Sequence, residues 1–183
     1  MRIIAGSSGG IRLQVPERVA RPSTDRLREA LFAILGEVVP GARVLDLFAG
    51  SGALGIEALS RGAAEARFVE ENASACEVIR ANLSRARLAG TVVKSDVFAF
   101  LRRGGGPFDL VVADPPYARP GRADLAGRLL EGEGLRSLLA AGGLVVIEVE
   151  SERDAPEAPG WTLADRRVYG SSAILFYEAE AAS

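Results

Sequence analysis

The spacing of apolar positions changes along the chain and separates a short N-terminal unit from the rest. Residues 3–5 and 11–15 are β-prone and are separated by glycines and serines, which predicts a hairpin with a loose loop. Residues 21–24, Arg-Pro-Ser-Thr, supply a proline and hydroxyl caps for a following helix. Because a Pro-Gly pair stands at residues 40–41, residues 1–40 are predicted to form an N-terminal appendage. The expected buried stripe of its helix consists of Leu27, Leu31, Ile34, Leu35 and Val38.

From residue 41 onward, short apolar runs alternate with helical patterns. This order is typical of a parallel sheet with helices on both faces, and it predicts an α/β domain over residues 41–183. The last two β-prone runs are expected to close the sheet as an antiparallel pair. The predicted strands are residues 44–47, 66–70, 92–93, 108–113, 144–149, 166–169 and 173–177.

Composition removes several classes of chemistry. The 183 residues contain no histidine and a single cysteine, Cys76, which excludes Ser-His-Asp and Cys-His catalysis, histidine-ligated metals, thiolate zinc clusters and internal disulfides. No metal is therefore expected, and the chemistry should use carboxylates, backbone groups and a cofactor. The sequence shows no signal-peptide pattern and no apolar run of membrane-spanning length, so we expect a cytoplasmic protein with no membrane partner.

Charge is unevenly distributed along the chain. The net charge of the whole chain is −2, yet residues 1–28 hold six arginines against two acidic residues. A basic N-terminal face on an acidic body is compatible with a phosphate-bearing partner, although arginines scattered over a solvated surface give the same count. These arginines are Arg2, Arg12, Arg18, Arg21, Arg26 and Arg28.

A strand, a glycine turn and the start of a helix follow one another in residues 44–55. Gly50, Gly52 and Gly55 have the G-x-G-x-x-G spacing, which lets a backbone approach a ligand and also occurs in tight turns without one. Asp46 places a carboxylate just before these glycines. A pyrophosphate disfavours an anion there, because the helix N-terminus already supplies the matching positive charge. The acid instead favours a cationic ligand such as S-adenosylmethionine, and hence methyl transfer over hydride transfer.

Acidic residues also follow the next two predicted strands. Ligands of open parallel sheets occupy the crevice beyond the carboxyl ends of the strands. Glu70 could accept both hydroxyls of a ribose there, but it could equally be a solvated strand end or serve NAD. Asp96 and Val97 could meet the amino group and a ring nitrogen of adenine, with a simple helix cap as the alternative for Asp96.

The fourth predicted strand is followed directly by Asp114, Pro115, Pro116 and Tyr117. A rigid turn is the simplest interpretation, because proline fixes φ and ends strands. The run also resembles the catalytic motif of methyltransferases that act on an amino group conjugated to a planar system. The Asp114 carboxylate and the Pro115 carbonyl would hold such an amine with its lone pair toward the methyl donor. Tyr117 would offer a face on which an extruded base can stack.

Several longer segments occur in an order that is more specific than any one motif. Residues 21–32, 46–63 and 114–117 are followed by Tyr169-Gly170 before the last predicted strand. In this order they resemble the RsmD family, bacterial enzymes that methylate N2 of a guanine in 16S ribosomal RNA using S-adenosylmethionine. The resemblance covers nearly the whole chain. It implies a class I S-adenosylmethionine-dependent methyltransferase fold, Rossmann-like, with a seven-stranded, mostly parallel sheet whose last strand is antiparallel, preceded by an N-terminal β-hairpin and helix.

The resemblance also implies a role for each matching position. The catalytic residues would be Asp114, Pro115, Pro116 and Tyr117. The cofactor would be held by Asp46, Phe48, Ala49, Gly50, Ser51, Gly52, Glu70, Asp96 and Val97. The RNA would be contacted by Arg2, Arg12, Arg21, Arg26 and Arg28. One segment departs from the family, because residues 6–10 are glycine and serine where its members usually carry basic residues.

The expected reaction is therefore methyl transfer to a guanine of 16S ribosomal RNA, within a 30S subunit or an assembly intermediate. Other amino-group methyltransferases are the nearest alternatives, with DNA adenine N6, DNA cytosine N4 or a protein glutamine as the acceptor. More distant alternatives are an NAD-dependent oxidoreductase built on the same glycine spacing and an RNA-binding module without activity.

Overall fold

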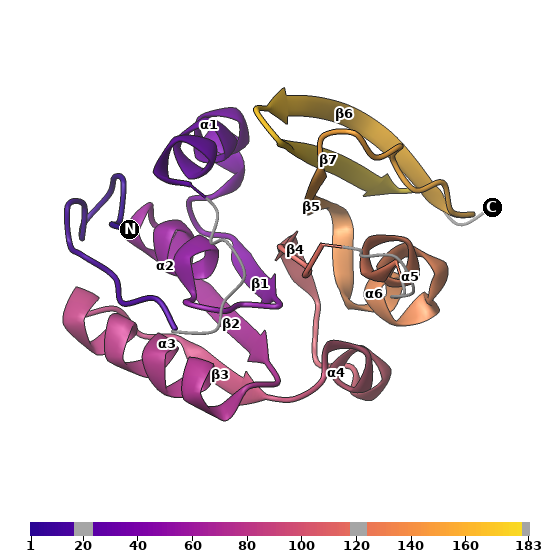
Figure 1. Cartoon of the computed structure of the whole chain (residues 1–183). Coiled ribbons are helices and arrows are strands. Elements are labelled where there is room, and N and C mark those ends of the chain that lie inside the picture. The colour runs from indigo at the N-terminus through magenta and orange to yellow at the C-terminus, as the bar shows by residue number, and fades with distance from the viewer. Residues whose placement is uncertain (17–23, 118–123, 181–183) are drawn as a thin grey trace.

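The computed structural model describes residues 1–16, 24–117 and 124–180, and a twisted sheet forms its centre (Figure 1). Its strands are β1 (Arg43–Leu47), β2 (Glu65–Glu70), β3 (Thr91–Lys94), β4 (Phe108–Ala113), β5 (Leu139–Glu150), β6 (Trp161–Tyr169) and β7 (Ser172–Ala179). In the described residues they form one seven-stranded sheet in the order β3-β2-β1-β4-β5-β7-β6. β1 to β5 are parallel, and β7 runs antiparallel to both β5 and β6. The predicted fold class is confirmed.

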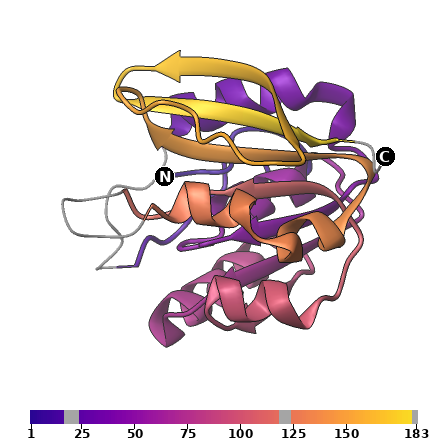
Figure 2. The ribbon, with the colours of Figure 1, turned by 90° about the vertical axis from the view of Figure 1, so that its right-hand side faces the viewer.

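Helices cover both faces of this sheet (Figures 1 and 2). One face carries α1 (Asp25–Leu35), α2 (Ala53–Ser60) and α3 (Ala73–Ala86), and the other carries α4 (Val97–Arg103), α5 (Leu125–Glu131) and α6 (Glu133–Leu138). Strand side chains alternate between the faces, so Val44 packs with the first three helices and Leu45 with the others. Each face therefore has its own apolar core, and the carboxyl ends of β1 to β5 meet at one edge of the sheet.

The α1 helix starts at its predicted cap and buries Leu27, Leu31 and Leu35 of the predicted stripe. The Thr24 hydroxyl accepts a hydrogen bond from the Leu27 N–H at 3.2 Å, as expected of an N-cap. Ile34 and Val38 are 41% and 44% exposed, so the prediction that they are buried is wrong. Val38 lies beyond the end of the helix, because Gly36 adopts a left-handed φ of 44° and stops it. Ile34 lies on the flank of the buried face.

The N-terminal segment folds back on itself as a short, irregular hairpin. The Ile3 N–H donates to the Ile11 carbonyl at 2.9 Å and the Leu13 N–H donates to the Met1 carbonyl at 3.2 Å, on either side of an antiparallel bridge between residues 2 and 12. The pairing is shorter than the predicted strands, because the next two N–H groups, of residues 4 and 5, donate instead to the Glu57 carboxylate of α2, at 2.7 and 3.1 Å. The segment therefore also lies along α2 and α3 (Figure 1).

A buried asparagine of α3 fastens the same segment to the core. The Asn82 Oδ1 accepts a hydrogen bond from the Gln14 N–H at 2.8 Å, and its Nδ2 donates to the Gln14 carbonyl at 3.0 Å. The same Nδ2 donates to the Ser51 carbonyl at 2.9 Å. Because Ser51 belongs to the glycine turn, one fully buried side chain joins the N-terminal segment, α3 and that turn.

Candidate active site

The glycine turn joins β1 to α2 at the carboxyl edge of the sheet. Phe48, Gly50 and Gly52 have left-handed backbone conformations, with φ values of 57°, 55° and 76°. Gly52 is the N-cap of α2, and a Cβ there would lie 3.0 Å from a side chain of α3. A Cβ on Gly55 would collide with an aromatic ring of β2. The first two glycines of the motif therefore serve the turn, and Gly55 serves the packing of α2 on the sheet.

Asp46 lies beneath the turn, whereas the sequence suggests a carboxylate at the tip of the strand. The residue is 1% exposed, and its Oδ2 accepts a hydrogen bond from the Gly55 N–H at 2.9 Å. Burial raises the pKa of this carboxyl well above its ordinary value, the Gly55 N–H opposes that effect, and the carboxylates of Asp114 and Glu70 add to it. The acidic side chains at the end of β2 and in the loop after β4 are therefore close enough to Asp46 of β1 to repel its negative charge.

Glu70, the last residue of β2, accepts hydrogen bonds from the backbone of the glycine turn and from the backbone that follows β2. Its Oε2 accepts a hydrogen bond from the Gly50 N–H at 2.9 Å, and its Oε1 accepts one from the Asn72 N–H at 2.8 Å. Each carboxylate oxygen has a second lone pair, so a ribose can still be accepted. The sequence places this acid correctly at the strand end but does not reveal that it holds the glycine turn. Ala49 and Ser51 of that turn are buried.

Asp96 is the N-cap of α4, as the helix-cap interpretation of this residue predicts. Its Oδ1 accepts a hydrogen bond from the Ala99 N–H at 2.8 Å. The neighbouring Val97 is buried. The rings of Phe48 and Phe98 meet edge to face, with centroids 6.4 Å apart. The segments that follow β1 and β3 are thereby in contact. Contact of Asp96 and Val97 with an adenine stays a prediction.

The loop after β4 is held at its far end by side chains. Asp114 is half-buried, Pro115 is buried and Pro116 is exposed. The Tyr117 hydroxyl lies 2.8 Å from Ser172 Oγ and donates a hydrogen bond to Glu148 Oε1 at 3.3 Å. Burial raises the pKa of this tyrosine, the bond to the serine lowers it, and nearby carboxylates raise it again, so at neutral pH the hydroxyl remains a neutral donor.

Both anchors of the Tyr117 hydroxyl escape prediction from the sequence. Glu148 lies in β5 and Ser172 begins β7, far along the chain from the loop. The one available signal is an acid inside the apolar run of residues 144–149. Its meaning depends on β5 being the neighbour of β4, which the topology supplies and the residue pattern does not.

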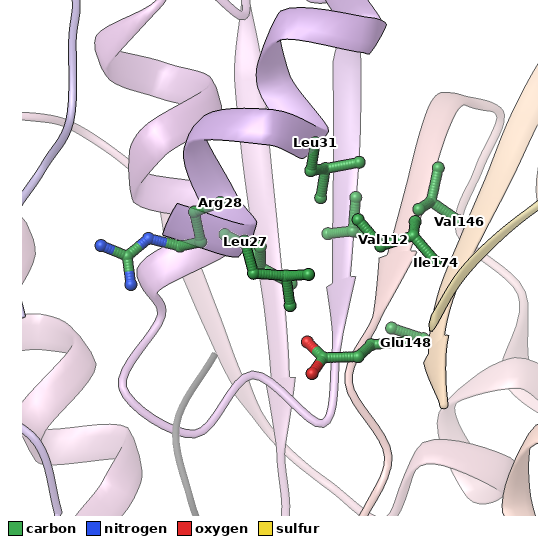
Figure 3. Close-up of a pocket in the computed structure, with 9 residues that line it drawn as sticks. Leu27, Arg28, Leu31, Val112, Val146, Glu148 and Ile174 are labelled. Atoms are coloured by element: carbon green, nitrogen blue, oxygen red, sulfur yellow. The ribbon is translucent and has the colours of Figure 1, made fainter. Parts of the chain in front are cut away.

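An apolar cavity adjoins this loop, between α1 and the sheet (Figure 3). Figure 3 shows the leucines of α1 pointing toward Val112 and Ile174, with the Glu148 carboxylate below Leu27. Glu148 and Arg28 are the charged residues of this lining. The lining consists of Leu27, Arg28, Leu31, Leu54, Val112, Ala113, Val146, Glu148 and Ile174.

The arginines proposed to face RNA separate into two groups. Arg2, Arg12 and Arg26 are exposed. Arg28 is fully buried, and its Nη2 donates to the Arg2 carbonyl and to Asp25 Oδ1, the latter at 2.9 Å. The prediction that Arg28 faces a partner is therefore wrong, because its guanidinium joins α1 to the N-terminal segment. The prediction for Arg21 lies outside the described residues.

The described part of the chain shows neither a metal cluster nor a membrane-spanning helix. Residues 1–16, 24–117 and 124–180 contain no group of three or more acidic, histidine or cysteine side chains that could hold a metal ion. Within the same ranges, every helix is too short or too polar to cross a lipid bilayer.

Known proteins resemble this chain over almost its full length. The family described as "Conserved hypothetical protein 95" matches residues 1–178. The "Ribosomal RNA small subunit methyltransferase D" of Escherichia coli strain K12 is 40% identical over 184 residues, which cover 99% of this chain and 91% of that protein.

Solved structures agree with these sequence relationships. The structure of yhhF from Escherichia coli has a TM-score of 0.86 at 39% identity, covering 100% of this chain and 99% of that one. The protein TTHA0928 of Thermus thermphillus has a TM-score of 0.82 at 40% identity, with 99% of both chains covered. The arrangement of the sheet, the helices and the loops at the carboxyl edge is therefore shared with these proteins.

Proposed function

Since the chain belongs to the RsmD family, the family described as conserved hypothetical protein 95, we propose that it is a methyltransferase that transfers a methyl group from S-adenosylmethionine to N2 of a guanine in 16S ribosomal RNA. The observation that carries the proposal is the Asp114-Pro115-Pro116-Tyr117 loop, anchored through its tyrosine hydroxyl beside a row of carboxylates at the carboxyl edge of the sheet. The name of the Escherichia coli relative supports ribosomal RNA of the small subunit as the acceptor.

The charges around the glycine turn fit this cofactor. The electrostatic neighbours that act on Asp46 are the acids Asp114 and Glu70, which together favour a cationic ligand and repel a diphosphate. When bound, S-adenosylmethionine supplies an electrophilic methyl group on a positively charged sulfur. The chain's contribution is to hold it, and the residues proposed for this are Asp46, Phe48, Ala49, Gly50, Ser51, Gly52, Glu70, Asp96 and Val97.

The loop after β4 is suited to hold a planar amine. The Asp114 carboxylate and the Pro115 carbonyl are acceptors for the two N–H bonds of the exocyclic amino group, and this leaves the nitrogen lone pair directed at the methyl donor. Such positioning contributes roughly 7–11 kcal/mol to lowering a barrier in the best cases. When the nitrogen gains the methyl group it releases a proton, for which Asp114 is the nearest proposed acceptor. The Tyr117 ring offers a stacking surface for the extruded base.

The N-terminal residues 1–40 are proposed to face the RNA. Exposed Arg2, Arg12 and Arg26 are available to phosphates, and Arg21 is proposed with them from the sequence. The glycine and serine loop of residues 6–10 adds no charge, so the number of phosphate contacts should be modest and the affinity correspondingly dependent on these arginines. The proposed partner is 16S ribosomal RNA inside a 30S subunit or an assembly intermediate.

A transfer assay tests the whole proposal. Small subunits from a strain that lacks the enzyme are incubated with the protein and methyl-labelled S-adenosylmethionine, and the labelled nucleotide is mapped and identified. We expect N2-methylguanine at one position of 16S ribosomal RNA. Label on another base or on a ribosomal protein would contradict the proposed acceptor. Calorimetry with S-adenosylhomocysteine and with NAD checks the cofactor separately, since tighter binding of NAD would contradict it.

A further inference from the structure

One carboxylate beside the proposed acceptor site has so far served only to anchor the Tyr117 hydroxyl. Glu148 is 9% exposed and belongs to β5, which is otherwise apolar at this point. Its Oε1 accepts a hydrogen bond from the Tyr117 hydroxyl at 3.3 Å, so this carboxylate lies against the loop that is proposed to hold the target base. A buried carboxylate is costly for a fold, which makes a function for it worth seeking.

The strand register places Glu148 beside Asp114. Ala113, the last residue of β4, pairs in parallel with Ile147 of β5, so Asp114 directly follows the end of β4 at the level of Glu148. Adjacent strands are about 4.8 Å apart, and side chains of paired positions point to the same face. Val112 and Val146, two residues before the acids, both belong to the core beneath α1. Asp114 and Glu148 therefore project to that same face, where the cavity of Figure 3 lies.

Two acceptors side by side match one edge of guanine. The exocyclic N2 amine and the ring N1–H of guanine are neighbouring donors, whereas adenine has no amine at this position and its N1 is an acceptor. If Asp114 holds the N2 amine, a second carboxylate on the adjacent strand is placed to accept from N1–H. This step rests on the proposed function, because it assumes that a guanine amine is bound at Asp114.

We propose that Glu148 is a specificity residue that accepts a hydrogen bond from N1–H of the target guanine, while the Tyr117 hydroxyl holds its carboxylate in place. A base that presents an acceptor at N1 would face the Glu148 carboxylate with two lone pairs opposed. Sites that leave a buried polar group unpaired discriminate strongly against such a base. Glu148 thus selects guanine, and Asp114 positions the amine that reacts.

A matched pair of substrates and variants tests this inference. The substrates are small subunits reconstituted with 16S RNA that carries either guanosine or 2-aminopurine at the mapped nucleotide. 2-Aminopurine keeps the reacting amine but has an acceptor at N1 in place of the N–H. We expect wild-type enzyme to methylate it roughly 10- to 100-fold more slowly than guanosine, the range typical of a hydrogen bond to a charged group.

The Glu148→Gln variant should change which base is preferred. Its activity on guanosine should fall by a similar factor of about 10 to 100, whereas 2-aminopurine should be methylated at least as fast as by wild type. The reason is that the glutamine amide can donate to an unprotonated N1. The exposed Glu152→Gln variant should keep the wild-type ratio between the two bases. Tyr117→Phe should slow guanosine more than 2-aminopurine, because the lost hydroxyl holds the Glu148 carboxylate in place.

Either of two results would overturn the inference: equal rates on both bases with wild-type enzyme, or a Glu148→Gln variant that keeps the wild-type ratio. The first result is obtained with wild-type enzyme alone, so it could not be explained by a variant that fails to fold. Failure of wild-type enzyme to methylate guanosine-containing subunits at all would instead overturn the proposed function. Binding of S-adenosylhomocysteine, measured in parallel, should be the same for Glu148→Gln and wild type.

Discussion

The two halves of the candidate site hold their side chains in different ways. In the half built on β1, β2 and β3, Asp46, Glu70 and Asp96 each accept hydrogen bonds from backbone N–H groups of a turn or helix. In the half built on β4, β5 and β7, the Tyr117 hydroxyl bonds to other side chains. A carboxylate bonded to backbone fixes the course of the main chain, whereas contacts between side chains fix rotamers. The first half therefore suits a ligand of constant shape, and the second suits a base that has to enter and leave.

The largest effect should come from the half that is proposed to hold the base. Replacing Asp114 by alanine removes the proposed acceptor of the amine, and we expect kcat to fall roughly 100- to 10,000-fold. The variant should still bind S-adenosylhomocysteine, because the backbone bonds of the other half are intact. Single-turnover kinetics and calorimetry measure the two quantities. Surviving turnover would remove Asp114 from its role, and the exposed Asp154→Ala variant is the matched control.

In the half proposed to hold the cofactor, we expect the stability of the fold to depend on pH. Burial raises the pKa of Asp46 above its unfolded value, so its contribution to stability is complete below about pH 4 and is lost as pH rises toward the raised pKa. An Asp46→Asn variant keeps an acceptor for the Gly55 N–H and does not ionise. The free energy of unfolding of wild type, relative to this variant, should therefore fall by up to about 1.4 kcal/mol per pH unit above pH 4. Urea unfolding over a pH series measures it, and parallel curves would contradict the assignment.

A smaller effect is expected from the side-chain anchor. Tyr117→Phe removes the bonds to Ser172 and Glu148, and a loss of about 1 kcal/mol of positioning corresponds to roughly fivefold in kcat. Tyr177→Phe is the control, because that hydroxyl makes one part-buried bond, to the Pro156 carbonyl, and lies away from the site. Both variants should lose similar stability, and the first alone should lose activity. Equal activities would show that the anchor has no part in positioning.

The smallest effect should come from the exposed arginines. Arg26→Gln should raise the Kd for RNA severalfold and reduce the slope of log Kd against log salt by about 0.7–0.9, without changing binding of S-adenosylhomocysteine. Arg28→Met is the contrast, because its buried guanidinium holds Asp25 and the Arg2 carbonyl. That variant should lower the melting temperature and leave the salt slope unchanged. A reduced slope for Arg28→Met alone would reverse the assignment of the two arginines.

The strands and the candidate catalytic residues could be predicted from the sequence, because each has a local signal. The alternation of apolar runs predicts the seven strands and the antiparallel closure, because each strand is largely decided by its own local pattern. Asp114 and Tyr117 stand out for the same reason, since two prolines directly after an apolar strand form a local signal. The short helices α5 and α6 are not predicted. Their packing against the sheet, rather than their own length, stabilises them.

What the sequence could not supply was the identity of distant partners. The first hairpin stays short because Glu57 of another element accepts the hydrogen bonds of its next two N–H groups. Arg28 is buried because its guanidinium bonds to Asp25 and to the N-terminal backbone. Glu148 gains its meaning from the register between β4 and β5. Each of these features depends on a contact between residues that are far apart in the sequence. The assembled fold creates that contact, and no local spacing indicates it.

The buried amide of Asn82 makes the beginning of the chain a support of the turn that is proposed to hold the cofactor. Trimming residues 1–16 would deprive that amide of both Gln14 partners, while its bond to the Ser51 carbonyl would have to hold the turn without them. The turn proposed to hold the methyl donor would then lose this support together with part of the surface proposed to contact the RNA. Shortened or swapped versions of this protein should therefore be designed from the α3 helix outward, with the leading segment of the chain kept in place.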